Sequence, residues 1–195
     1  MNVCTSYVLS RGLPESIITE WCLGYGQWSE QFPQLRDRLT VPIAGYTETA
    51  FAIAGRTLTE EKPKWWNTPF SKSRWLYGLW KPALSAPILV ESYLDVWALR
   101  LLGYTGYAVM ASEMSPWQAA HVAGRFSDAI VYPHADTTGN QWLQTLSRFG
   151  VRAFVPWEPY PQGMPSDADA HWLYVNQRDW LLSQVKQVEE MLQHG

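Results

Sequence analysis

The feature that most constrains the fold is a short aliphatic run that ends in acidic residues and is followed by a helical pattern. It occurs at 88–90, which leads into Glu91 and Asp95, and again at 128–132, which leads towards Asp136. Each occurrence predicts a strand, a turn and a helix. In a parallel α/β sheet the carboxyl ends of the strands lie along one edge, where ligands bind. We therefore expect these carboxylates to converge on one crevice.

The same alternation continues through the second half of the chain. Strands are predicted at 88–90, 107–110, 128–132 and 151–155, and the helices between them at 93–102, 115–126 and 139–149. Strands that alternate with short helices indicate a parallel sheet with right-handed crossovers. A third acidic turn, with Asp167 and Asp169, follows the last of these strands.

The first part of the chain has a different pattern. A short helix is predicted at 14–23, because the segment begins with Pro and ends just before Gly. Two strand-like runs, 38–43 and 49–54, are separated by a turn that contains Gly45. Their spacing is typical of an antiparallel pair.

The predicted fold class is α/β, in which an α+β subdomain precedes a largely parallel sheet flanked by helices. The predicted boundaries are 1–85 for the amino-terminal subdomain, 86–175 for the parallel-sheet domain and 176–195 for a C-terminal helix.

Carboxylates from several strand ends predict a site for Mg²⁺ or Mn²⁺, because both ions prefer oxygen ligands. Two such ions would lower the pKa of an attacking hydroxyl and neutralise charge on a phosphoryl group. Phosphoryl transfer is therefore the predicted chemistry. The alternative is that the acids cap helix N-termini and complement the helix dipole. Three acidic strand ends on one sheet edge favour the metal site over capping alone.

The segment 56–81 is the one locally basic and aromatic part of the chain. Basic side chains for phosphates beside rings for bases are the composition of a single-strand-binding surface. The alternative is a solvated loop that is anchored by its tryptophans. The residues that make up this pattern are Arg56, Lys64, Trp65, Trp66, Lys72, Arg74, Trp75, Tyr77, Trp80 and Lys81.

The composition excludes several classes of protein. A hydrophobic fraction of 47% supports a folded globule, and a net charge of −3 excludes a polybasic nucleic-acid binder. Two cysteines, Cys4 and Cys22, are too few for a disulfide framework or a four-ligand zinc site. No run approaches the roughly 18 apolar residues that span a bilayer, so we expect a cytoplasmic protein without a membrane partner.

Three acidic motifs carry a resemblance to a known family. Residues 91–95 read Glu-Ser-Tyr-Leu-Asp, residues 134–139 read His-Ala-Asp-Thr-Thr-Gly, and residues 163–169 end in Asp-Ala-Asp. These resemble the motifs of the Toprim domain in the catalytic core of bacterial and phage DnaG-type DNA primases, which are Glu-Gly-Tyr-x-Asp, Asp-x-Asp followed by Gly, and a last acidic pair.

The amino-terminal half is similar to the same family. Residues 63–69 match the family's Pro-Lys-Tyr-x-Asn-Ser/Thr-Pro, and residues 76–79 match its Leu-Tyr-Gly-Leu. Shorter matches occur at 11–13, 23–25 and 55–56. Topoisomerases and some nucleases share the Toprim motif, whereas the matches at 63–69 and 76–79 point to primases in particular.

The resemblance implies a function and a set of site residues. It implies synthesis of short RNA primers from ribonucleotides on a single-stranded DNA template, in a site with two Mg²⁺ or Mn²⁺ ions. The implied catalytic residues are Glu91, Asp95 and Asp136, and the implied metal ligands are Glu91, His134, Asp136, Asp167 and Asp169. The implied nucleic-acid-binding residues are Arg38, Arg56, Lys64, Trp65, Asn67, Lys72, Arg74 and Tyr77.

The resemblance covers neither a zinc-binding domain nor a helicase-interaction domain. A separate zinc-binding or helicase protein is therefore an expected partner, an arrangement that suits a phage or a mobile element.

The sequence departs from the family at three positions near the acidic site. His134 replaces the first Asp of Asp-x-Asp, Ser92 replaces the Gly of the first motif, and Glu113 stands in a turn that contains Gly in the family. Imidazole binds Mn²⁺ more readily than Mg²⁺. The departures leave two alternatives to a primase: a catalytically degenerate Toprim protein that binds DNA or a replication partner, and a Toprim nuclease, against which the primase-like amino-terminal half argues.

Overall fold

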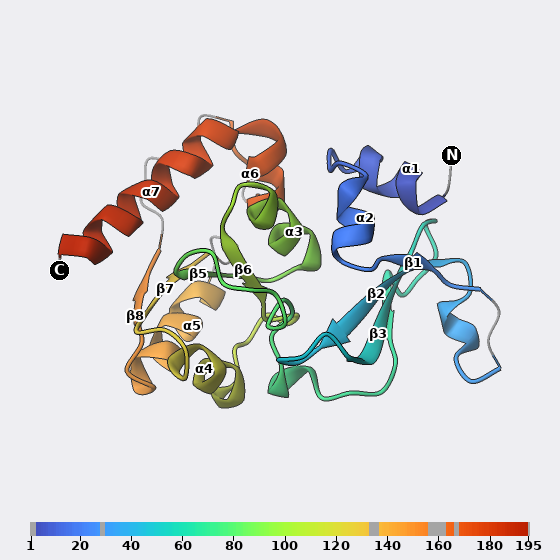
Figure 1. Cartoon of the computed structure of the whole chain (residues 1–195), viewed down its shortest axis with the longest axis horizontal. Helices are drawn as coiled ribbons and strands as arrows, with labels where there is room; N and C mark the ends of the chain where they lie inside the picture. The colour runs from blue at the N-terminus through green and yellow to red at the C-terminus, as the bar shows by residue number, and fades with distance from the viewer. Residues whose placement is uncertain (1–2, 28–29, 133–136, 156–162, 166–167, 195) are drawn as a thin grey trace. The chain divides into compact units, whose positions relative to one another are not determined.

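The computed structural model describes residues 3–27, 30–132, 137–155, 163–165 and 168–194. The chain divides into two compact units, residues 1–70 and residues 71–195. In Figure 1 the first unit runs from blue to teal and the second from green to red.

The first unit is built on a four-stranded antiparallel sheet with the strand order β1-β2-β3-β4. The strands are β1 (Gly24–Tyr25), β2 (Arg38–Ala44), β3 (Ala50–Thr57) and β4 (Trp65–Asn67). Two helices precede the sheet, α1 (Val3–Ser10) and α2 (Ser16–Glu20), and a 3₁₀ helix, η1 (Pro33–Leu35), lies between β1 and β2. Fully buried apolar side chains from α1, α2 and β2, which include Val8, Ile17, Leu39 and Val41, contribute to its core.

The second unit is built on a parallel sheet with the strand order β6-β5-β7-β8. The strands are β5 (Pro87–Val90), β6 (Thr105–Ala108), β7 (Asp128–Val131) and β8 (Arg152–Phe154). The helices are α3 (Tyr93–Leu101), α4 (Pro116–Ala123), α5 (Thr137–Arg148), α6 (Ala170–Asn176) and α7 (Arg178–His194), and a 3₁₀ helix, η2 (Lys72–Arg74), precedes the sheet.

The parallel sheet is covered by helices on both faces. Figure 1 shows α4 and α5 on one face and α3, α6 and α7 on the other. Leu89, Tyr107 and Val131 of the strands pack with Val122 of α4 and Trp142 of α5 in one buried cluster. Strands that are buried on both faces read as continuous apolar runs, and all four residues of β5 are buried.

Two glycines allow close packing beside the central strands. A Cβ on Gly106 of β6 would lie 3.1 Å from the Cα of Val96, so glycine lets α3 approach the sheet. Gly78 has a φ of +98°, and a Cβ there would lie 2.8 Å from the carbonyl oxygen of Gly106. A larger residue at Gly78 is therefore disfavoured both by its backbone conformation and by the lack of space.

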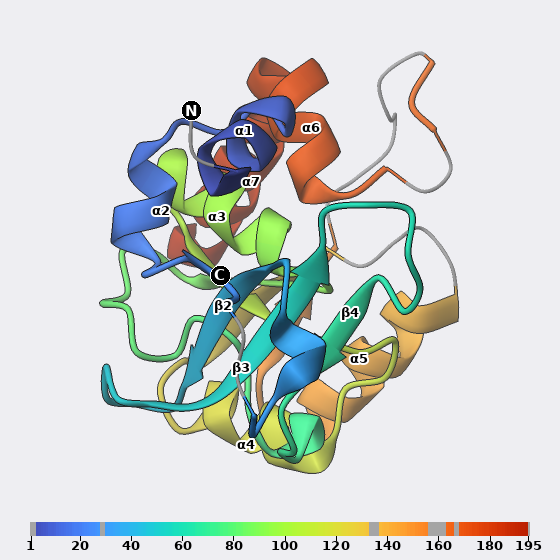
Figure 2. The same ribbon diagram turned by 90° about the vertical axis from the view of Figure 1, so that its right-hand side faces the viewer.

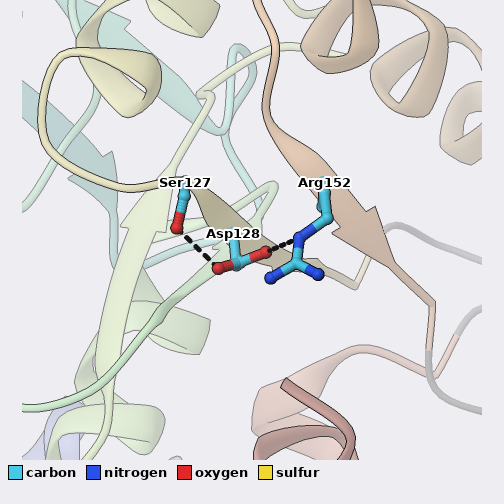
Figure 3. A network of polar contacts seen from close by, with 3 residues as sticks. All are labelled: Ser127, Asp128 and Arg152. Atoms are coloured by element: carbon cyan, nitrogen blue, oxygen red, sulfur yellow. Dashed lines mark hydrogen bonds and ion pairs between the residues drawn. The ribbon is translucent and has the colours of Figure 1, made fainter. Parts of the chain in front are cut away.

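An ion pair joins the first residues of β7 and β8 (Figure 3). Arg152 Nε lies 2.5 Å from Asp128 Oδ1, and the Ser127 hydroxyl donates to Asp128 Oδ2 at 2.6 Å. Burial raises the pKa of Asp128, but the hydrogen bonds from Arg152 and Ser127 outweigh it and hold the pKa below its usual value. Because the Arg152 side chain is 53% exposed, the pair contributes about 1 kcal/mol or less to the pairing of β8.

The predicted fold class is confirmed, with an antiparallel sheet first and a parallel sheet with helices after it. The antiparallel pair β2–β3 and three of the four parallel strands lie where the sequence predicts them, whereas β6 begins and ends two residues before the predicted range 107–110. The sequence did not predict α1, the short strands β1 and β4, or the 3₁₀ helices η1 and η2. Among the described residues, no helix is both long enough and apolar enough to span a bilayer.

The boundary between the compact units differs from the predicted domain boundary at residue 85. Residues 71–85 are part of the second unit, because their backbone is bonded to β6. The Tyr77 amide donates to the Ala108 carbonyl oxygen at 2.9 Å, and the Leu84 amide donates to the Thr105 hydroxyl at 2.7 Å. The predicted C-terminal helix is α7, which begins at Arg178.

Candidate active site and nucleic-acid interface

Glu91 follows the last residue of β5, the strand that pairs with both β6 and β7. Both neighbouring strands hold this strand end by backbone hydrogen bonds. The Met110 amide donates to the Glu91 carbonyl oxygen at 3.1 Å, and the Tyr132 amide donates to the Leu89 carbonyl oxygen at 2.8 Å. Glu91 is half-buried. Its backbone is therefore fixed at the carboxyl edge of the sheet, as the sequence predicts.

Ser92 begins α3 with a capping box. Its hydroxyl oxygen accepts from the Asp95 amide at 3.4 Å, and Asp95 Oδ2 accepts from the Ser92 amide at 3.1 Å. Ser92 has a φ of −117°, an extended conformation that any residue adopts. The replacement of the family's glycine by Ser92 therefore causes no backbone strain, and it adds a helix N-cap.

Asp95 is buried between two helix N-termini, with 1% of its surface exposed. Its Oδ2 also accepts from the Ser92 hydroxyl at 2.7 Å. Its Oδ1 accepts from the backbone amide of His171, near the start of α6, at 2.8 Å. The carboxyl group thus satisfies amide groups that have no partner within their own helices, and it joins α3 to α6.

Asp169 is the N-cap of α6, and its Oδ1 accepts from the Trp172 amide at 2.7 Å. Burial, followed by the negative charge of Asp169, raises the pKa of Asp95 to about 7, although the hydrogen bonds from His171 and Ser92 oppose the shift. The structure thus brings together two of the predicted acidic residues, Asp95 and Asp169, and both make helix-capping contacts.

Three predicted site residues, His134, Asp136 and Asp167, lie outside the described residues. Among the residues that are described, no group of three Asp, Glu, His or Cys side chains is placed to hold a metal ion. The donor chemistry of Glu91 and Asp169 fits Mg²⁺ or Mn²⁺, since both supply carboxylate oxygens. Asp95 fits a supporting position better than a direct ligand, because both of its oxygens already accept hydrogen bonds.

Met110 is an unusual residue beside this edge that the sequence reading did not identify. It has a φ of +62°, in the left-handed region that favours glycine. The Tyr93 hydroxyl donates to its Sδ at 3.4 Å. The signal in the sequence was the loss of the family's glycine-containing turn at this point, but the sequence does not reveal which residue takes the left-handed conformation.

The predicted nucleic-acid residues of the first unit occupy different environments. Arg38 is buried, and its Nη1 donates to the Pro63 carbonyl oxygen at 3.0 Å. The Arg56 guanidinium lies 5.7 Å from the Tyr7 ring and 5.4 Å from the Trp65 ring, a cation–π arrangement. Lys64 is exposed and the neighbouring Asn67 of β4 is half-buried. Arg38 therefore holds the loop before β4, whereas Lys64 is open to solvent.

The other three predicted nucleic-acid residues belong to the second unit. Lys72 is half-buried and Arg74 is exposed, and both belong to η2. Tyr77 is fully buried, and its hydroxyl accepts from Trp97 Nε1 at 2.9 Å. Its ring packs edge-on against Trp80 and Tyr93. Tyr77 is thus a core residue, and neither face of its ring is exposed to a nucleotide. This placement differs from the prediction that Tyr77 contacts DNA.

Comparison with known proteins yields DNA primases among the sequence relatives, and no protein-family model matches the chain. The chain is 30% identical over 120 residues to the DNA primase of Halalkalibacterium halodurans, and the aligned segment covers 56% of this chain and 20% of that protein. It is 36% identical over 117 residues to the DNA primase of Haemophilus influenzae, 55% of this chain and 20% of that protein. The matches span about a fifth of the length of these primases.

The fold is shared with solved primase structures. A structure of the DnaG primase catalytic domain bound to single-stranded DNA superposes with a TM-score of 0.76 and 20% sequence identity, over 95% of this chain and 74% of that one. At this identity the similarity establishes the fold.

Proposed function

We propose that this chain, which is a homologue of the catalytic core of bacterial DnaG-type primases, synthesises short RNA primers on single-stranded DNA by metal-dependent nucleotidyl transfer. The observation that carries the proposal is the combination of sequence similarity to primases with the shared fold of their catalytic core. The position of Glu91 at the carboxyl edge of the parallel sheet supports it further, because this edge is where ligands bind in open α/β sheets.

The proposed roles follow from the environment of each residue. Glu91, half-buried at the strand end, acts as the lead metal ligand or as the acid/base. Asp95 positions this edge by joining α3 to α6. The further ligands are Asp169 and three residues outside the described ones, His134, Asp136 and Asp167. When bound, Mg²⁺ or Mn²⁺ supplies charge neutralisation and lowers the pKa of the attacking hydroxyl.

The proposed partners are a single-stranded DNA template and ribonucleotides, with a separate zinc-binding or helicase protein as a further partner. Lys64 and Arg74 are the exposed cations of the predicted interface, and they suit contacts with phosphates. The solved relative that is bound to single-stranded DNA supports this choice of template.

The test is a primer-synthesis assay with mixed single-stranded templates, labelled ribonucleotides and either Mg²⁺ or Mn²⁺. We expect short products from the wild type and none from Glu91→Gln, since glutamine lacks the negative charge that holds a divalent ion. Glu190→Gln, an exposed position on α7, is the matched control and keeps full activity. Absence of template-dependent products from the wild type with both ions would contradict the proposal.

A second candidate function is binding of DNA or a replication partner without polymerisation. The features that favour it are His134, which stands where the family has an acidic metal ligand, and Glu113, which adds a negative charge in the turn after β6. This function predicts DNA binding of equal affinity in the wild type and in Glu91→Gln, with no primer product from either protein.

A further inference from the structure

The basic helix η2 is fastened to α4 by side chains of α4, both within the second unit, and Figure 2 shows the two helices side by side. The amide of Gln118, which is 1% exposed, reaches the carbonyl oxygens of Lys72 at 3.1 Å and of Trp75 at 2.9 Å. The Ser115 hydroxyl donates to the Ser73 carbonyl oxygen. Side chains of α4 and its N-cap therefore hold the backbone of η2 along its length.

His121 completes this attachment one turn further along α4. Its Nε2 lies 2.7 Å from the Arg74 carbonyl oxygen, and because a carbonyl oxygen only accepts, Nε2 carries the proton. The His121 ring stacks on Trp75 at 5.4 Å between centroids with an interplanar angle of 17°. Trp75 is thus half-buried against the core, with one ring face already covered.

The exposed side chains of this assembly include a cation, Arg74, and a large ring, Trp117, and Lys72 beside them is half-buried. Trp117, in the first turn of α4, is 60% exposed, and the Arg74 guanidinium lies 5.7 Å from its ring centroid. Lys72 lies two residues before Arg74 on the same η2 turn. We call these three residues, Lys72, Arg74 and Trp117, the α4 ledge.

We propose that the α4 ledge binds single-stranded DNA, with a base stacked on Trp117 and the adjoining phosphates at Arg74 and Lys72. The inference rests on the proposed function and extends it to a residue outside the predicted interface. An indole that is mostly in water contributes little to core packing, and the Arg74 guanidinium beside Trp117 places a cation next to the exposed ring. A ring for bases beside cations for phosphates is the combination that binds single strands without sequence preference.

The rigidity of the ledge supports this occupant. Holding four successive carbonyl groups of residues 72–75 fixes the backbone from which Lys72 and Arg74 project. A backbone that is already fixed reduces the entropic cost of ordering this segment when a ligand binds. The charge is complementary to phosphate, although Glu113, exposed in the loop before α4, adds one negative charge nearby. A polyanion with stacking bases fits these features better than an apolar protein surface.

The test measures binding of a fluorescein-labelled oligothymidylate by anisotropy, with the whole chain and without ribonucleotides. We expect Trp117→Ala to weaken binding about tenfold, in the range for loss of one stacked base. Trp117→Phe retains most of the affinity, because a phenyl ring also stacks. The matched control is Phe149→Ala, which removes another exposed ring, 41% exposed, that lies next to Arg148. Its affinity stays at the wild-type value.

An abasic oligonucleotide of the same length separates stacking from phosphate contact. The wild type and Trp117→Ala are expected to bind it equally, because the base that Trp117 would stack on is missing. Equal binding of the thymidylate by these two proteins would overturn the inference about Trp117 and leave the proposed template role untouched. A protein partner would then be the occupant to test at Trp117. No binding of the thymidylate by the wild type would overturn both the inference and the template role. Primer synthesis is not needed for the readout, so an inactive site leaves the test intact.

Discussion

The two helices that follow β5 and β6 begin with the same capping device, built from different residues. Ser92 and Asp95 cap α3, and Ser115 and Gln118 cap α4. In each, the serine oxygen accepts from the backbone amide three residues on, and that residue's side chain accepts from the serine amide, at 3.1 Å in α3 and 3.0 Å in α4. Locally the two junctions are equivalent.

They differ in what the third residue of the helix does with its remaining hydrogen-bonding capacity. The Asp95 carboxylate takes a further amide donor, His171 at the start of α6. Gln118 Nε2 carries N–H groups, and it donates to the carbonyl oxygens of Lys72, Trp75 and Val109. The carboxylate of Asp95 accepts, so it can bind the free amide groups at the start of α6. The amide nitrogen of Gln118 donates, so it can bind the free carbonyl groups of η2 and the residues beside it. The replacement of oxygen by nitrogen therefore decides which neighbouring segment each helix start holds.

The largest expected effect comes from removing the donors of the second junction. Gln118→Glu keeps the shape and the capping acceptor but places oxygens against three carbonyl groups. Loss of the Nε2 donor at these carbonyl groups, and the approach of a buried carboxylate oxygen to them, lower the free energy of unfolding by about 3 kcal/mol. Urea denaturation measures the loss, and Gln144→Glu, exposed on α5, is the control with a change within about 0.5 kcal/mol. A stable Gln118→Glu protein would contradict the distinction between donor and acceptor junctions.

The first junction is expected to show a pH-dependent effect. The folded pKa of Asp95, about 7, lies above its ordinary value of 3.8, so the folded state holds this proton more tightly. The contribution to stability is complete below about pH 4 and is lost as the pH rises through about 7. The side chain of Asp95→Asn does not titrate, so the stability of the wild type relative to this variant falls by up to about 4 kcal/mol across that interval.

Urea denaturation of the wild type and of Asp95→Asn at several pH values between about 4 and 8 measures this difference. A difference that is independent of pH would show that the carboxyl is ionised throughout, and the two junctions would then differ only in hydrogen bonding.

A third comparison concerns backbone strain, which is present after β6 and absent after β5. Met110 has a φ of +62°, whereas Ser92 is extended. Met110→Gly and Met110→Ala remove the same thioether contact with Tyr93, so the difference between them isolates the strain. We expect the Gly variant to be more stable than the Ala variant by about 1 kcal/mol in thermal denaturation. Equal stability would mean that the left-handed conformation is not costly here.

The smallest expected effect is at Ser92. Ser92→Ala removes the hydroxyl that bonds to Asp95, and costs about 1 kcal/mol of unfolding free energy. Ser92→Gly, which restores the family's first motif, costs only a few tenths of a kcal/mol. Primer synthesis that is unchanged in Ser92→Gly would agree with a serine that is compatible with the site, and a large gain in activity would show that its side chain obstructs the site.

Much of the fold could be predicted because its signals are local. The apolar run of β5 and the alternation of strands with helices are each recognised from residues that are close together in the sequence. The strand β4 was missed because it has three residues, Trp65–Asn67, and is a strand only through its pairing with β3. Trp117 was missed because a tryptophan in a helical run reads as core until its surroundings are known.

The sequence by itself determined the order of the elements, the parallel sheet and the position of Glu91 at its carboxyl edge. Only the tertiary structure decided what the remaining residues do. The Asp95 carboxylate meets an amide 76 residues away, and Tyr77, in a segment predicted to contact DNA, is buried beside Trp97. Local patterns specify a helix start or a strand. Burial and hydrogen-bond partners depend on which distant segments pack together, and a local pattern carries no information about that packing.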